Sequence, residues 1–160
     1  MRQMGVLFPG LDSDLARIQA AFGETLLIYL TRTNKLEQAI SLVKAAQTGL
    51  WHMAADGSEL ERSSEPHEPM YDAKAISDEL ARLTELDDAW RGWFKSENLM
   101  PLEITYDELS YDPKHVLGGI LDELGLETMV ARDIEPPTTK LADKTSRIWA
   151  NRFLAEHGCS

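Results

Sequence analysis

Arg32 stands where a short apolar strand is expected to end and a helix to begin. The strand is predicted at residues 26–30, a run too short for a helix and typical of a buried parallel strand. Apolar residues at helical spacing follow, and Asn34 and Glu37 have the spacing of a capping box. A planar guanidinium beside the unpaired N–H groups of a helix start suits a phosphate. Pairing with Glu37 or another acid is the alternative for Arg32.

Two further residues of the predicted helix could serve an anion at the same place. Lys35 follows the cap directly and could add positive charge. Ser41 lies two turns into the helix, near enough for its hydroxyl to reach an anion at that end. The alternatives are a solvated lysine and a serine that points to solvent or bonds back to a carbonyl one turn earlier.

Three blocks of the sequence together resemble the bacterial trehalose sulfotransferase-type family. Their sequences are LTRTNKLEQAISLVKAAQTGLWH, GSELERSSEPHEPMYDAKAI and ITYDELSYDP, and they follow the family's order with similar gaps. The resemblance implies sulfuryl transfer from 3′-phosphoadenosine-5′-phosphosulfate (PAPS) to a carbohydrate hydroxyl, with a trehalose-like acceptor. It also implies a homodimer, and that Arg32 and Ser41 hold the 3′-phosphate of PAPS or of 3′,5′-ADP.

The start of the chain departs from this family. Family members begin with a strand and a Ser/Thr/Gly-rich loop that grips the 5′-phosphosulfate, whereas MRQMGVLFPGLDSD resembles a point well inside the family's chain. We therefore expect one sulfotransferase-like domain over residues 1–160 without that strand and loop, binding the 3′-phosphate with little or no transfer activity alone. The alternatives are a non-catalytic interaction or dimerisation module derived from a sulfotransferase, since a sheet without its first strand exposes an edge, and a degenerate gene product.

The same resemblance singles out three residues beyond the strand-helix junction. His52 could accept the proton of an attacking sugar hydroxyl, although a histidine at a helix end is more often a capping or structural group. Trp51 contacts the acceptor or packs the following loop. Lys140 stands where the family carries an arginine near the nucleotide phosphate, which keeps the charge but loses the bidentate fork.

The composition excludes several classes of function. A net charge of −11 argues against nucleic acid and anionic membrane as partners, while a small anion needs only a local positive site. Cys159 is the single cysteine, so no intrachain disulfide and no multi-thiolate metal site is expected, and a reducing cytoplasm suits the chain best. No metal-spaced His or Cys cluster and no apolar run of membrane-spanning length is present.

The chain as a whole is predicted to be α/β, a helix-rich, partial P-loop-like sulfotransferase fold with a small parallel sheet flanked by helices. Strands are expected at residues 5–8 and 102–106, and a loop near the acceptor or a disordered surface loop at 53–71. Helices should begin after the cap Ser13 (or Asp12), at Asp72 and after the cap Asp112, and the last should cover residues 141–157. In the second of these helices, Trp90 and Trp93 should pack in the core rather than form a sugar platform, and the acids 87 and 88 should lie on a solvated face.

Overall fold

A computed structural model describes residues 10–54, 56–135 and 144–158 of the chain. The strand expected at residues 5–8, and Lys140, lie outside the described residues.

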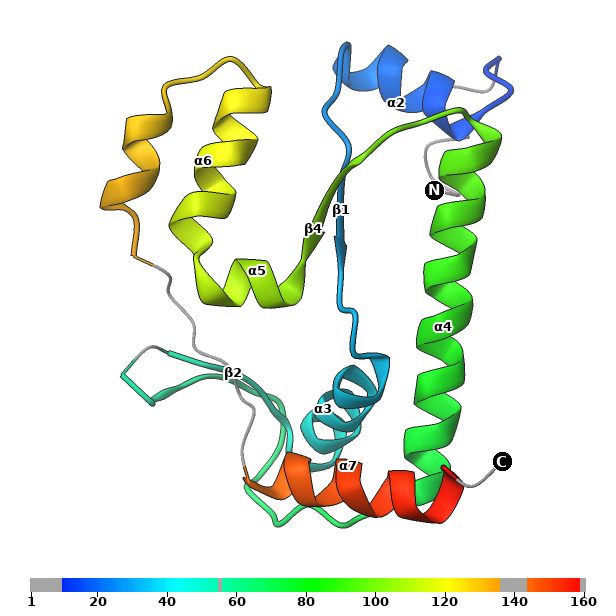
Figure 1. Cartoon of the computed structure of the whole chain (residues 1–160), viewed down its shortest axis with the longest axis vertical. Helices are drawn as coiled ribbons and strands as arrows, with labels where there is room; N and C mark the ends of the chain where they lie inside the picture. Colours follow the sequence, from blue (N-terminus) through cyan, green and yellow to red (C-terminus); the bar gives the residue numbers. More distant parts are fainter. Residues whose placement is uncertain (1–9, 55, 136–143, 159–160) are drawn as a thin grey trace.

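A two-stranded parallel sheet lies at the centre of the molecule (Figure 1). It consists of β1 (Ile28–Thr31) and β4 (Leu102–Thr105), which pair in register from Ile28 opposite Leu102 to Thr31 opposite Thr105. Side chains alternate between the two faces, so Tyr29 and Thr31 share the face that meets α4 (Ala73–Ser96). Helices surround this small sheet, and the predicted α/β class is confirmed.

Three of the predicted helices begin within one residue of their predicted starts. They are α2 (Asp14–Phe22), α3 (Lys35–Thr48) and α4, and the side chains of Ser13, Asn34 and Asp72 accept a backbone N–H at their amino ends. The last helix, α7, covers Lys144–His157. No helix in the described ranges is both long enough and apolar enough to cross a bilayer.

The core forms where α3 packs between α4 and α7 (Figure 1). Ile40 of α3 and Ile76 of α4 are completely buried there, and Trp149 and Phe153 of α7 close the cluster. Burial of this apolar face, rather than helix propensity, holds α3 in place beneath the carboxyl end of β1.

After β4 the chain forms a separate group of short helices. They are α5 (Tyr106–Tyr111), α6 (Pro113–Glu123) and the 3₁₀ helix η1 (Thr128–Asp133). Asp112 caps α6 ahead of its first-turn proline, as predicted. The predicted Schellman ending is also present, because the Gly125 and Leu126 amides donate to Asp122 and Leu121 carbonyls.

The prediction of a loop throughout residues 53–71 is wrong in part, because this segment contains a strand. β2 (Leu50–Met53) and β3 (Glu59–Arg62) form an antiparallel hairpin directly after α3. Polar contacts hold it, including donation from the Arg62 guanidinium to the Thr48 carbonyl at 2.6 Å. The hairpin buries little apolar surface, so no hydrophobic alternation marked it in the sequence.

Candidate functional site

Arg32 lies directly beyond the carboxyl end of β1 and before the first turn of α3. Its side chain is only 12% exposed, and its guanidinium lies 4.7 Å from the ring centre of Tyr106. Nη2 donates to Oε2 of Glu37 at 2.9 Å. The pairing with Glu37 that the sequence left open is therefore present, and it occupies only part of the guanidinium.

The guanidinium of Arg32 keeps a donor for a further acceptor. Its Nε is buried and has no hydrogen-bond partner within the part of the chain that the structure describes. Tyr106 covers one face of the planar group and leaves its donor edge for hydrogen bonding. A buried donor without an acceptor costs free energy, so an anion that reached Nε together with Nη2 would gain a charge-assisted, bidentate contact.

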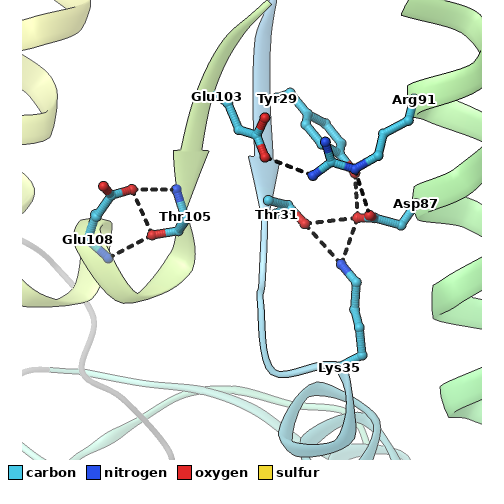
Figure 2. Close-up of polar contacts among 8 residues, drawn as sticks. All are labelled: Tyr29, Thr31, Lys35, Asp87, Arg91, Glu103, Thr105 and Glu108. Carbon is cyan, nitrogen blue, oxygen red and sulfur yellow. Dashed lines mark hydrogen bonds and ion pairs between the residues drawn. The ribbon is translucent and has the colours of Figure 1, made fainter.

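Lys35 does not extend into solvent. Its ammonium donates to Oδ1 of Asp87 at 2.7 Å and to the hydroxyl of Thr31 at 2.9 Å, as Figure 2 shows. Lys35 therefore belongs to a polar network between α3, β1 and α4, and its charge is neutralised there by a carboxylate.

Asp87 is the centre of this network, and the predicted solvated position is wrong. Its side chain is 18% exposed, and Tyr29, Thr31 and Lys35 all donate to Oδ1 (Figure 2). Partial burial by itself would raise the pKa of the Asp87 carboxyl, but these donors and Arg91 outweigh it and hold the pKa well below its usual range. The cause of the wrong prediction is tertiary, because the partners come from β1 and α3.

Arg91 extends the network to the second strand. Its Nε donates to Oδ2 of Asp87 at 3.1 Å, and its Nη2 donates to Oε1 of Glu103 at 2.8 Å. Glu103 lies on β4 opposite Tyr29 of β1. Asp87 and Arg91 together therefore fix α4 against both strands of the sheet.

A cleft of about 430 Å³ lies between β1 and α4. Arg32, Lys35 and Asp87 line it, together with Trp90 and Trp93. Trp90 is 45% exposed, so its predicted packing in the core is wrong. The reason is that α4 continues past α3 toward the start of β1 (Figure 1), and Trp90 lies on this part of α4, where it lines the cleft.

The other residues expected at the site lie farther along the chain, on α3 and on β2. Ser41 is half-buried in the middle of the helix. Trp51 and His52 lie on β2, which follows the carboxyl end of α3. There, Nδ1 of His52 is 2.6 Å from Oε2 of Glu61. The 14 residues of α3 extend over about 21 Å at the usual helical rise. Arg32 and the strand that carries His52 therefore lie at opposite ends of α3.

Tyr71, the last residue of the loop predicted at residues 53–71, is anchored on α7. Its hydroxyl donates to Oε2 of Glu156 at 2.6 Å, and Arg152 lies over its ring at 3.9 Å from the centre. Burial of the phenol and this hydrogen bond raise the pKa of Tyr71 to about 12. The end of the loop that was expected to be near the acceptor is thus fixed to the core helices.

Tyr71→Phe should lower the free energy of unfolding by about 1 kcal/mol at pH 7, because the variant loses the hydrogen bond to Glu156. The pKa of Tyr71 is raised in the folded state, so this contribution is complete below about pH 10 and is lost as the pH rises toward 12. Urea unfolding of wild type and variant at pH 7 and at pH 11 measures it. An equal difference at both pH values would show that the phenol does not contribute in this way.

Among the described residues, no three His, Cys, Asp or Glu side chains form a group that could hold a metal ion. The polar groups that the fold brings together are instead cations near a strand end, balanced by Asp87 and Glu37.

Comparisons with known proteins show the family of the chain. A model of the Stf0 sulphotransferase family matches residues 1–156. The chain belongs to this family. It is similar to the trehalose 2-sulfotransferase of Mycolicibacterium smegmatis, with 29% identity over 130 residues that cover 81% of this chain and 46% of the relative. The trehalose 2-sulfotransferase of Mycobacterium tuberculosis is 28% identical over 146 residues, 91% of this chain and 52% of the relative. The chain thus spans about half the length of these curated relatives.

In this Stf0 sulphotransferase family member, Tyr106 beside Arg32 and Arg91 of the polar network were not singled out from the sequence. Tyr106 directly follows β4, as Arg32 follows closely on β1, and the carboxyl ends of parallel strands meet at one edge. That rule could have placed the two side chains together. Asp87 and Arg91, four residues apart on a predicted helix, indicated only a surface ion pair.

Proposed function

We propose that this chain binds the 3′-phosphate of PAPS for sulfuryl transfer to a carbohydrate hydroxyl, with a trehalose-like acceptor. The observation that carries the proposal is Arg32, a largely buried guanidinium with an unpaired Nε at the end of a parallel strand. The family supports it in general terms, since both relatives are named trehalose 2-sulfotransferase.

Each residue has a defined part in this proposal. Arg32 provides two parallel N–H donors to the phosphate, and Tyr106 keeps the guanidinium in one orientation. The amino end of α3 adds backbone dipoles, and the Ser41 hydroxyl and Lys140 add further contacts to the nucleotide. Asp87 holds Lys35 and Thr31 and so fixes the turn that carries Arg32.

The reaction exchanges one bond to sulfur for another. The acceptor hydroxyl oxygen forms a bond to the sulfur as the bond from sulfur to the bridging phosphate oxygen breaks, and 3′,5′-ADP leaves. A base takes the proton of the hydroxyl. His52, oriented by Glu61, and Trp51 are proposed on the acceptor side. Both lie beyond the other end of α3 from Arg32, so the acceptor would approach from that end of the helix; a homodimer is a further part of the proposal.

Isothermal titration of the purified chain with 3′,5′-ADP and with 5′-AMP tests the nucleotide site. We expect 3′,5′-ADP to bind about tenfold or more tightly than 5′-AMP, because only it has a phosphate for Arg32. Equal affinities for the two nucleotides, or no binding of 3′,5′-ADP at millimolar concentration, would refute the proposal.

A further inference from the structure

Glu37 places a carboxylate on the same guanidinium that the proposed function assigns to a phosphate. Its Oε2 accepts from Nη2 of Arg32 at 2.9 Å. Glu37 lies in the first turn of α3, where the Asn34 side chain accepts its backbone N–H. The backbone of Glu37 is therefore fixed, while its side chain is free to take another rotamer: 42% of that side chain is exposed.

The contact that Glu37 makes with Arg32 is incomplete. The carboxylate of Glu37 accepts from Nη2, and the buried Nε beside it has no acceptor in the described part of the chain. A phosphate can accept from both nitrogens at once and carries more charge than a carboxylate. The carboxylate of Glu37 thus occupies the place of the anion but leaves the Nε donor of Arg32 without a hydrogen bond.

We propose that Glu37 is a specificity-determining residue of this site. Its carboxylate occupies the position on Arg32 that a 3′-phosphate takes, and it must turn away before the nucleotide binds. The inference rests on the proposed function. Because Glu37 competes only with the group that binds Arg32, it lowers the contribution of the 3′-phosphate to affinity and leaves the rest of the nucleotide unaffected.

Glu37→Gln tests the inference by isothermal titration with 3′,5′-ADP and 5′-AMP. An ion pair of this partial exposure is worth up to about 1 kcal/mol, so we expect 3′,5′-ADP to bind about three- to fivefold more tightly to the variant. The affinity for 5′-AMP should not change. Glu123→Gln, at the exposed last residue of α6, removes the same charge and should change neither affinity.

The outcomes separate this inference from the proposed function. If 3′,5′-ADP binds wild type in an Arg32-dependent way but binds Glu37→Gln equally or more weakly, Glu37 orients Arg32 or has no part, and the inference is wrong while the function stands. A gain for both nucleotides, or the same gain in Glu123→Gln, would indicate a general charge effect and also overturn it. If no protein binds 3′,5′-ADP, the proposed function itself fails.

Discussion

Arg32→Ala should weaken the binding of 3′,5′-ADP about a hundredfold, which corresponds to about 2.7 kcal/mol. The variant loses two charge-assisted hydrogen bonds to the phosphate and leaves Glu37, a negative charge, beside it. The affinity for 5′-AMP should fall by less than about threefold, since this ligand has no 3′-phosphate. Isothermal titration of wild type and variant with both nucleotides measures the two effects.

Arg32→Lys separates the geometry of the site from its charge. A lysine keeps the positive charge but offers no fork, so we expect an affinity between those of wild type and Arg32→Ala. Arg82→Ala is the matched control, because this arginine is exposed on α4 and pairs with Glu79 of the same helix. Urea unfolding of each variant shows whether it is folded. Folded Arg32→Ala with wild-type affinity for 3′,5′-ADP would contradict the assignment of the phosphate to Arg32.

Asp87→Ala should lower the free energy of unfolding by about 3 kcal/mol. The change removes the shared acceptor of Tyr29, Thr31, Lys35 and Arg91, and it leaves the ammonium of Lys35 partly buried without its counter-charge. Breaking a buried pair costs 3–5 kcal/mol, and the partial exposure of both side chains places this case at the lower end. Urea unfolding at pH 7 measures the loss.

The pH dependence of this loss is specific to Asp87. Its pKa is lowered in the folded state, so its contribution is complete above about pH 4, the usual range of an aspartate, and is lost as the pH falls below that value. The difference between wild type and Asp87→Asn should therefore be constant from pH 7 to about pH 4 and shrink below it. Asp88→Asn, at the exposed neighbouring acid, should have little effect at any pH. A similar loss in both variants would show that Asp87 has no special role.

Features of this fold that depend on neighbouring residues could be predicted from the sequence. Asn34 and Asp112 mark helix starts because their side chains bond to backbone only three residues ahead. Gly125 marks an end because the left-handed backbone there favours glycine. Arg32 was found by the same kind of reasoning, since its place between a strand and a helix follows from adjacent segments.

Features that depend on distant parts of the chain could not be predicted in this way. Asp87 follows Thr31 by 56 positions, and nothing near it in the sequence indicates that partner. Trp90 has the spacing of a core residue, but its exposure depends on how far α4 extends past α3. The hairpin of β2 and β3 was missed because backbone and polar contacts, rather than buried apolar residues, hold it together.

The two sides of the proposed phosphate site belong to parts of the molecule that should open at different rates. Arg32 precedes α3, whose Ile40 is completely buried between α4 and α7. Tyr106 belongs to the group of α5, α6 and η1, which packs chiefly within itself and joins the rest through β4. Amide hydrogens of α3 should therefore exchange with solvent last and those of α5 much earlier. A nucleotide held by Arg32 against Tyr106, the first residue of α5, would join these two units, and protection would spread from Tyr106 along α5.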